Sequence, residues 1–281
     1  MRIANLNDRA VLLDGDRALD VERASDGRFP ADPQRVYDDW EAFRAWAERA
    51  DLSAAEPFDP AELGPPVPTP RQIFAIGLNY RDHAEEASLP HPEHLVVFTK
   101  FQSSLAGPHA QVPVPGDTVD YETELVIVLG RGGRDIDEAD AWDHVAGLSV
   151  GQDISERTIQ RRGPAAQFSL GKSYPNFAPF GPAVVSVDEL ADKNALTIRA
   201  ELDGNGTGGP MTLQEGNTRD MIFSVPQTIA QLSEVVTLLP GDIIFTGTPA
   251  GVGMSKNLFL RPGHVLTSEI EGIGRLVNSF V

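Results

Sequence analysis

The stretch that decides the fold is DYETELVIVLG, residues 120–130. It opens with acidic and polar residues and continues as a hydrophobic run typical of a buried strand. Side chains two positions apart point to the same face of a strand, so Glu122 and Glu124 would lie side by side. Their face continues with Val126 and Val128. Burying two adjacent ionised carboxylates is costly, so the pattern predicts either a cation between them or a strand end open to water.

Hydrophobic runs of strand length recur from Gln72 onward. They are IFAIGLN (73–79), LVVFTKF (95–101), ELVIVLG (124–130), GPAVVSV (181–187), LTIRAEL (196–202), DIIFTG (242–247) and HVLTSEI (264–270). The clearest helix is VPQTIAQLSEVVTLL (225–239), which a Pro-Gly stop closes. Many strands with long loops and few helices predict a mainly β barrel or roll with helices on its outside.

The first 68 residues have a different pattern. RIANL (2–6) and RAVLLDGDRALDV (9–21) predict short antiparallel strands with an Asp-Gly turn. Apolar residues at spacings of three and four predict an amphipathic helix over 33–52. The proline-rich stretch at 62–72 predicts a stiff connector. We therefore expect a small N-terminal α+β domain with its linker at 1–68, which supplies no metal ligand, and a catalytic domain at 69–281.

Composition excludes several classes of protein. The formal net charge of −18 argues against nucleic-acid binding, which depends on positively charged side chains that neutralise phosphates. It does not exclude a small acidic substrate, provided that the binding site contains a local cation. The absence of cysteine excludes disulfides, thiolate nucleophiles and zinc–thiolate sites. The N-terminus lacks the apolar core of a signal peptide, and no apolar stretch approaches the roughly 20 residues of a membrane span. These features predict a cytoplasmic protein without a membrane partner.

A third carboxylate joins the two glutamates. Asp153 follows an apolar run in LSVGQDISERTIQRRG (148–163) and precedes a predicted short helix at 155–162. Three carboxylates without cysteine or clustered histidine form a hard oxygen set that suits Mg²⁺, Mn²⁺ or Ca²⁺ better than Zn²⁺. The alternative is a group of solvated carboxylates at strand ends.

In GLNYRDHAEEASLP (77–90), His83 and Glu86 stand three positions apart, on one face of a predicted helix. A carboxylate that accepts from one imidazole nitrogen raises the basicity of the other, so the pair could activate water. The alternative is a surface helix with an incidental contact. The prolines that follow predict a short segment able to act as a lid.

Two more stretches carry candidate substrate contacts. Lys172, in FSLGKSYPNFAPFGP (168–182), is one of only four lysines in the chain and could face a carboxylate or enolate oxygen. IIFTGTPAGVG (243–253) is a glycine-rich turn with hydroxyls at Thr246 and Thr248, and it lacks the lysine of a Walker motif. Its backbone N–H groups and threonine could hold a substrate carboxylate.

In this order, the stretches resemble the fumarylacetoacetate hydrolase family over roughly residues 70–281. The matching segments are IGLNYRDHAEE (76–86), VDYETELVIVLG (119–130), GQDISERTIQ (151–160), LGKSYPNFAPFGP (170–182), GNTRDMIFSVPQTIAQLS (216–233) and LLPGDIIFTGTPAGVG (238–253). The resemblance implies an α+β fold, a mixed β-sandwich roll, generally found as a homodimer. Two features depart from the family pattern: Gln152 stands where asparagine is common, and the stretch at 202–217 is longer and richer in glycine.

The resemblance also implies roles for individual residues. Glu122, Glu124 and Asp153 fall on the ligands of Mg²⁺ or Mn²⁺, and His83 and Glu86 fall on the catalytic pair of the lid. Lys172 falls on a substrate-binding and catalytic lysine. Gln160 and Thr248 fall on substrate-binding positions.

Together these features predict a divalent-metal-dependent hydrolase that cleaves a C–C bond in a small 1,3-diketo or 2-oxo acid, such as an acylpyruvate or fumarylpyruvate. The metal would chelate the 2-oxo acid portion and polarise its carbonyl. The alternative is an oxaloacetate-type decarboxylase, or an isomerase of unsaturated 2-oxo acids, at the same site without an attacking water. A third reading is a non-catalytic metal-binding protein on an enzyme fold.

Overall fold

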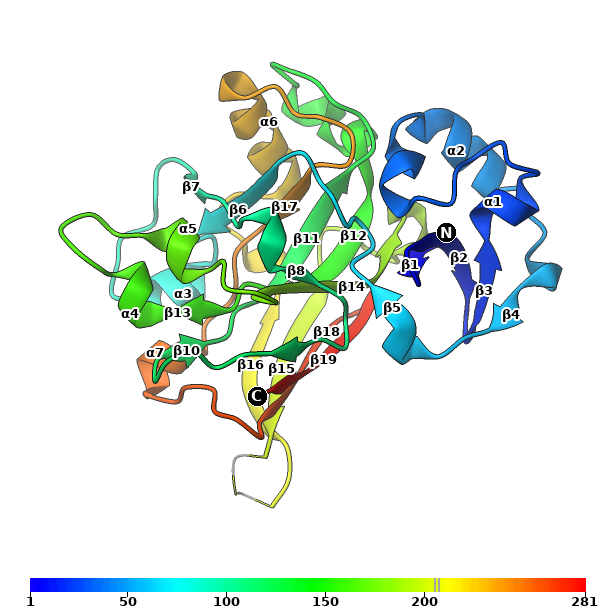
Figure 1. Ribbon diagram of the computed structural model, residues 1–281. Helices are drawn as coiled ribbons and strands as arrows, with labels where there is room; N and C mark the ends of the chain where they lie inside the picture. Colours follow the sequence, from blue (N-terminus) through cyan, green and yellow to red (C-terminus); the bar gives the residue numbers. More distant parts are fainter. Residues whose placement is uncertain (205, 207) are drawn as a thin grey trace.

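The structure is a computed structural model that describes residues 1–204, 206 and 208–281. Asn205 and Thr207, inside the glycine-rich stretch at 202–217, lie outside the described residues. The architecture is strand-rich, with mixed sheets and a few short helices (Figure 1). The predicted α+β class is therefore confirmed.

A large sheet of 12 described strands forms the centre of the molecule. Its strand order is β4 (Glu56–Pro57), β3 (Arg17–Asp20), β2 (Arg9–Asp14), β1 (Arg2–Leu6), β14 (Ala178–Val185), β12 (Val145–Gln152), β11 (Thr123–Leu129), β17 (Ile243–Phe245), β6 (Ile73–Gly77) and β7 (Val96–Phe98). Two short strands join from the side, β5 (Leu63–Gly64) on β1 and β8 (Leu105–Ala106) on β14.

A second sheet packs against the first. Its order is β16 (Met211–Asn217), β15 (Thr197–Asp203), β18 (Val265–Ile270), β19 (Gly274–Phe280) and β9 (Gln111–Val112). Along β15 only alternate residues are buried, which is typical of a sheet with one face in the core. A separate pair, β10 (Val119–Asp120) with β13 (Ser155–Glu156), lies beside the candidate site.

The described helices are short and lie outside the sheets (Figure 1). They are α1 (Val21–Ala24), α2 (Trp40–Ala47), α3 (Arg81–Glu86), α4 (Arg157–Gln160), α5 (Phe168–Gly171), α6 (Val225–Val235) and α7 (Gly253–Lys256). The Ser224 hydroxyl and the Gln227 side chain cap the start of α6 reciprocally. No helix in the described part of the chain has the length and apolar character needed to cross a bilayer.

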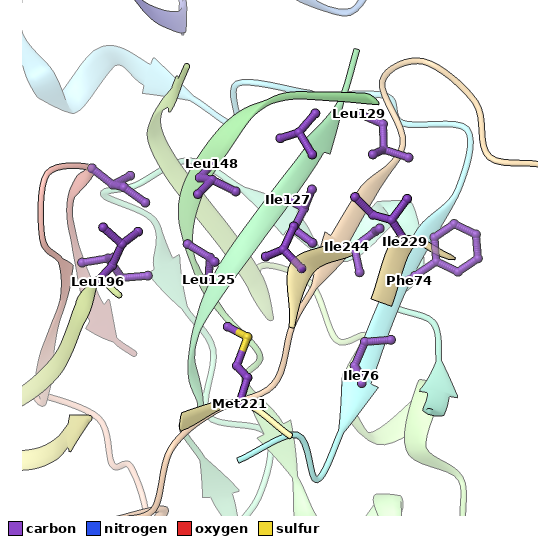
Figure 2. Packing of buried hydrophobic residues seen from close by; sticks show 14 of the residues in the cluster. Phe74, Ile76, Leu125, Ile127, Leu129, Leu148, Leu196, Met221, Ile229 and Ile244 are labelled. Carbon is purple, nitrogen blue, oxygen red and sulfur yellow. The ribbon is translucent and has the colours of Figure 1, made fainter. Parts of the chain in front are cut away.

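Strand β11 runs through the middle of the core, and all seven of its residues are buried. Its odd-numbered side chains pack with α6 and the second sheet, as Figure 2 shows for Leu125, Ile127 and Leu129. Val126 and Val128 belong to the cluster on the opposite face. Burial on both faces explains why the sequence of this strand is a continuous apolar run, not an alternating one.

Three predicted helices differ from the observed ones. The short helix predicted at 155–162 is reduced to α4 (Arg157–Gln160), because Ser155–Glu156 pair with β10 as strand β13. The segment predicted as one helix at 33–52 is a 3₁₀ turn (Pro33–Tyr37) followed by α2. Asp39 breaks the helix because it adopts a non-helical conformation and its side chain accepts from the Ala42 N–H. Helix α6 ends at Val235, four residues before the expected stop, because Leu238 exchanges backbone hydrogen bonds with Gly133.

The N-terminal strands continue the large sheet. Strand β1 pairs antiparallel with β14, with Ile3 opposite Val184. The core cluster that contains Val126 and Val128 includes side chains from both the N-terminal residues and the rest of the chain, for example Trp40 and Val128. The boundary at residue 68 stays a prediction, and the shared sheet indicates that the N-terminal residues support the strands that carry the site.

Replacing Trp40 with alanine tests this support. Trp40 is buried, and a β-carbon on Gly130 would lie 2.3 Å from its ring, so the ring covers the end of β11. We expect Trp40→Ala to lower the free energy of unfolding by about 3–5 kcal/mol, with unchanged Mg²⁺ affinity in the protein that remains folded. Urea unfolding and calorimetric titration measure both, with the half-buried Trp46→Ala as control. A smaller loss for Trp40→Ala than for the control would contradict the proposed support.

Candidate active site

The three predicted metal ligands meet where β11 begins and β12 ends. The two strands are antiparallel, with Thr123 opposite Gln152, so Asp153 lies beside Glu122 and its N–H donates to the Glu122 carbonyl at 2.9 Å. One carboxylate oxygen from each of Glu122, Glu124 and Asp153 lies within 4.8 Å of the others. All three side chains are buried.

Two buried lysines bind these carboxylates. Lys172 Nζ donates to Glu122 Oε2 at 2.7 Å and to Asp153 Oδ2 at 2.5 Å. Lys100 Nζ donates to Asp153 Oδ1 at 2.5 Å and to the Lys172 carbonyl. Burial alone would lower the pKa of Lys172, but Asp153 and Glu122 outweigh it and raise that pKa. Lys172 therefore stays charged between two of the predicted ligands.

Arg157 provides a third buried cation. Its Nη2 donates to Glu122 Oε1 at 2.6 Å, and its Nε donates to Asp120 Oδ2 at 2.8 Å. Burial opposes ionisation of Glu122, but Lys172 and Arg157 hold the pKa of Glu122 well below its usual range. Asp120 also accepts from the Gly253 and Met254 N–H groups, so it ties α7 to Arg157.

Glu124 has no cationic partner among the described residues. Its carboxylate accepts from the Gly247 N–H at 2.8 Å. Burial, reinforced by Asp153 and Glu122, raises the pKa of Glu124 well above its usual value. The acids of this network (Asp120, Glu122, Glu124 and Asp153) outnumber its bases (Lys100, Arg157 and Lys172) by one. A divalent cation fits this hard oxygen set, because it would compensate the carboxylate that lacks a partner.

The backbone N–H of Gly247 points toward the Glu124 carboxylate because Gly247 adopts a left-handed conformation, which glycine accommodates more easily than other residues. Its φ is +92°, and a β-carbon there would lie 2.8 Å from the Asn79 β-carbon. The Asn79 amide in turn donates to the Thr246 carbonyl at 2.8 Å and accepts from the Phe223 N–H at 2.8 Å. Asn79 thus fixes the glycine-rich turn relative to the chain that leads into α3.

The predicted catalytic pair lies on α3. His83 Nδ1–H donates to Glu86 Oε2 at 3.4 Å, at the long end of hydrogen bonding. Glu86 also accepts from the Gly251 N–H at 3.0 Å and from the Ser255 hydroxyl at 2.7 Å. Because a carboxylate only accepts, Nδ1 carries a proton, and Nε2 is the nitrogen without one in the neutral imidazole. The contacts of Glu86 also hold α3 against the turn that precedes α7.

The other predicted substrate contacts lie at the same place. Gln160 Oε1 accepts from Arg157 Nη1 at 2.9 Å. The Thr248 hydroxyl donates to the Thr123 carbonyl and accepts from the Gln214 amide, both at 2.8 Å, so its hydrogen bonds stay within the protein. The hydroxyl of Thr246 likewise donates to a backbone carbonyl. These contacts position the turn, and a role toward substrate stays a prediction.

Gln152, which departs from the family pattern, supports the ligand strand. Its Oε1 accepts from the Glu122 N–H at 3.0 Å, and its Nε2 donates to the hydroxyls of Thr123 and Ser268 at 2.6 and 2.7 Å. The buried amide is therefore satisfied on both sides. It connects the backbone of Glu122 to the second sheet.

A cavity of about 500 Å³ is lined by all the predicted site residues except Asp153 and Glu86, which bind residues of its wall. Its polar wall includes His83, Glu122, Glu124, Arg157, Gln160, Arg161, Lys172 and Thr248. Its apolar wall includes Ile76, Leu78, Leu89, Val96, Phe98 and Phe168. The elements around it, α3, α4, α5 and α7, lie on the side of the molecule away from the N-terminal strands (Figure 1).

Sequence reasoning assigned no role to Lys100, Arg157 or Asp120. The scarcity of lysine could have drawn attention to Lys100, which lies inside the strand-like run at 95–101. Nothing in the sequence distinguishes Arg157 from the neighbouring arginines of SERTIQRR. Burial separates them, because Arg157 is 6% exposed whereas Arg161 and Arg162 face solvent.

Comparison with known proteins places the chain among enzymes. The model of the fumarylacetoacetate (FAA) hydrolase C-terminal family matches residues 72–281. The human mitochondrial oxaloacetate tautomerase FAHD2A is 40% identical over 220 residues, which are 77% of this chain and 68% of that protein. A solved protein from Mycobacterium smegmatis has 50% identity and a TM-score of 0.93, over 100% of this chain and 99% of that one.

A solved maleylpyruvate hydrolase from Sphingobium sp. SYK-6, in complex with manganese(II) and pyruvate, has 30% identity and a TM-score of 0.79. The match covers 100% of this chain and 99% of that one. The family match spans most of the chain, and the relatives include a hydrolase and a tautomerase. The resemblance seen in the sequence is therefore confirmed: this chain belongs to the fumarylacetoacetate hydrolase family.

Proposed function

We propose that the protein is a divalent-metal-dependent hydrolase that cleaves a C–C bond in an acylpyruvate-like 2,4-dioxo acid. The observation that carries this proposal is a cavity lined by Glu122, Glu124 and His83, with Asp153 beside the two glutamates and Glu86 bound to His83. The manganese and pyruvate bound by the related maleylpyruvate hydrolase support it.

Glu122, Glu124 and Asp153 would hold Mg²⁺ or Mn²⁺. When bound, the ion supplies Lewis-acid polarisation of the 2-oxo carbonyl. Lys172 Nζ, between Glu122 and Asp153, places a fixed positive charge close to the carboxylates at which the 2-oxo acid would bind. That charge favours the enolate that forms when the C–C bond breaks.

His83 provides the base for hydrolysis. With Nδ1–H bound to Glu86, its Nε2 removes a proton from water, and the hydroxide attacks the 4-oxo carbon. The C3–C4 bond then breaks, its electron pair passes into the 2-oxo acid portion as an enolate, and C3 takes a proton to give pyruvate. The acyl portion leaves as a carboxylic acid.

The apolar wall of the cavity favours a substrate with an acyl group. Val96, Phe98 and Phe168 line the cavity together with the carboxylates, and the Phe98 ring lies 5.0 Å from Lys172 Nζ. Such a surface suits a hydrocarbon substituent better than water. Oxaloacetate has four carbons and two carboxylates, so it has no hydrocarbon substituent that could contact this apolar wall.

The second candidate is tautomerisation or decarboxylation of oxaloacetate, or isomerisation of an unsaturated 2-oxo acid. The 40% identity to the human oxaloacetate tautomerase favours it. In a tautomerase the same His83 would transfer a proton between C3 and the 2-oxygen, with no attacking water. The homodimer and the cytoplasmic location also stay proposals, based on the family resemblance and on the sequence respectively.

Product analysis separates the two candidates. We expect acetylpyruvate and longer acylpyruvates, with Mg²⁺ or Mn²⁺, to yield pyruvate and the matching carboxylic acid in equal amounts. Oxaloacetate is assayed in parallel for enol–keto conversion and for CO₂. Rapid enol–keto conversion together with no pyruvate from any acylpyruvate would reject hydrolysis in favour of the second candidate.

A further inference from the structure

Asp120 is a fully buried carboxylate behind the cavity wall, and four donors face it. Its Oδ1 accepts from the N–H groups of Tyr121 at 2.8 Å and Gly253 at 2.7 Å. Its Oδ2 accepts from the Met254 N–H at 3.0 Å and from Arg157 Nε at 2.8 Å. A carboxylate only accepts, so it satisfies all four donors, whereas an amide would present an NH₂ group to two of them. The side chain therefore links β10 to both α4 and α7.

The contacts through Arg157 lead to the metal ligands. While its Nε donates to Asp120, its Nη2 donates to Glu122 Oε1 at 2.6 Å and its Nη1 donates to Gln160 Oε1 at 2.9 Å. Glu122 and Gln160 both line the cavity. Because the guanidinium is a rigid plane, a partner that holds Nε also fixes the direction of the two outer nitrogens. Asp120 thus determines how Arg157 meets the cavity wall.

The contacts through α7 lead to the catalytic pair. A β-carbon on Gly253, the first residue of α7, would lie 2.6 Å from Asp120 Oδ1, so a side chain here would displace α7. The same segment holds Glu86, whose Oε1 accepts from the Gly251 N–H at 3.0 Å and from the Ser255 hydroxyl at 2.7 Å. Figure 1 shows β10, α4, α7 and α3 together at one side of the molecule.

We propose that Asp120 is a positioning residue that sets the geometry of the metal ligands and of the catalytic pair together. It acts on Glu122 through Arg157 and on Glu86 through α7, and it does not contact substrate. The proposal deepens the proposed function, since it rests on His83 as the base that Glu86 orients. Loss of the Asp120 carboxylate leaves Arg157 paired with Glu122 alone and removes the support of the segment that holds Glu86.

Asp120→Asn tests both sets of contacts. Its amide oxygen can keep the Gly253 bond, but its NH₂ group then faces Arg157 Nε and the Met254 N–H. We expect Mn²⁺ affinity to fall by about tenfold, because Arg157 competes more strongly for Glu122. We expect kcat for acylpyruvate hydrolysis at saturating Mn²⁺ to fall by roughly 10- to 100-fold, as for a misplaced catalytic group. Asp117→Asn, at an exposed position three residues earlier, is the control for charge.

A double-mutant cycle separates positioning from general destabilisation. If Asp120 acts on kcat through Glu86, Asp120→Asn should cost less than about threefold when Glu86 is already glutamine. The measurement is kcat for the wild type, Asp120→Asn, Glu86→Gln and the double variant, each at saturating Mn²⁺. An equal loss in both backgrounds would mean that Asp120 does not act through the catalytic pair, and it would overturn the proposal.

Nitrogen NMR of the histidine rings keeps the proposal separate from hydrolysis. At mildly alkaline pH, where an imidazole is neutral, the signals of His83, identified with His83→Gln, report which ring nitrogen carries the proton. We expect Nδ1 in the wild type and in Asp117→Asn, and a mixture with Nε2 in Asp120→Asn, whatever the reaction is. Unchanged His83 signals or unchanged Mn²⁺ affinity in Asp120→Asn would overturn the proposal.

Ser255→Ala keeps the test decisive if Asp120→Asn does not fold. Ser255 is exposed, so its replacement leaves the core intact and removes one of the contacts between α7 and Glu86. We expect the His83 signals to shift toward the Nε2–H form and kcat for hydrolysis to fall by about three- to tenfold. His83 signals identical to those of the wild type would show that α7 does not orient the pair, and they would reject the role of Asp120.

Discussion

Replacing Glu124 with glutamine is expected to lower the affinity for Mg²⁺ and Mn²⁺ by about 100-fold or more and to remove most turnover, while the fold stays intact. Substitutions in the outer shell of metal sites already cost about 10- to 100-fold. A ligand substitution should cost at least as much, because it removes both a negative charge and a strong oxygen donor.

The fold should survive because Glu124 makes no ion pair with the residues that the structure describes. Its carboxylate accepts from the Gly247 N–H at 2.8 Å, and a glutamine carbonyl can accept the same bond. Burial and the neighbouring acids raise the pKa of Glu124, so a neutral side chain relieves the metal-free site. In the presence of a chelator, we expect the melting temperature of Glu124→Gln to equal or exceed that of the wild type.

Glu122→Gln provides the contrast. Glu122 binds Arg157 at 2.6 Å and Lys172 at 2.7 Å, so its neutralisation leaves buried cations short of a carboxylate and should cost about 3–5 kcal/mol of stability. Calorimetric Mg²⁺ titration and thermal unfolding of both variants check these expectations. Mg²⁺ affinity at the wild-type level in Glu124→Gln would remove Glu124 from the metal site.

Replacing Glu86 with glutamine is expected to lower acylpyruvate hydrolysis by about 10²- to 10⁴-fold with little change in metal affinity. The amide oxygen can still accept from the Gly251 N–H and the Ser255 hydroxyl, which bind Glu86 Oε1 at 3.0 and 2.7 Å. The amide NH₂ group then faces His83 Nδ1 and donates to it. The proton of the imidazole moves to Nε2, so the nitrogen that should accept from water becomes a donor.

The neighbouring Glu85→Gln is the matched control. Glu85 lies on the same helix but is exposed, so its substitution changes the helix charge without touching His83. Steady-state kinetics with acylpyruvate and with oxaloacetate, measured for both variants, check the expectation. Decarboxylation of oxaloacetate needs no activated water and should fall far less than hydrolysis. Equal hydrolytic rates in Glu86→Gln and Glu85→Gln would exclude the pair from the mechanism.

Helix α3 depends on tertiary contacts for its position. It spans only Arg81–Glu86, which is too short for stability on its own. Arg81 donates to the carbonyls of Asp220 and Met221 at one end, and Glu86 binds the turn before α7 at the other. These hydrogen bonds hold the helix at both ends, and its movement as a lid over the cavity stays a prediction.

The sequence by itself determined the strands, the family and the candidate ligands. The apolar run of β11 predicted a buried strand, and the spacing of Glu122 and Glu124 placed both carboxylates on one face of that strand. The capping residues Ser224 and Gln227 mark the start of α6. These signals are local, because strand burial and helix capping depend on residues a few positions apart.

Only the tertiary structure decided how the charges pair. Lys100 and Asp153 stand 53 residues apart in the chain, and Lys172 and Glu122 stand 50 apart. The sequence left open whether a cation or water would compensate the two glutamates. Within the described part of the chain, Glu122 has two cationic partners and Glu124 has none. The structure also joins β1 to β14 in one sheet. Such pairings follow from strand register and packing between distant segments, which no local pattern encodes.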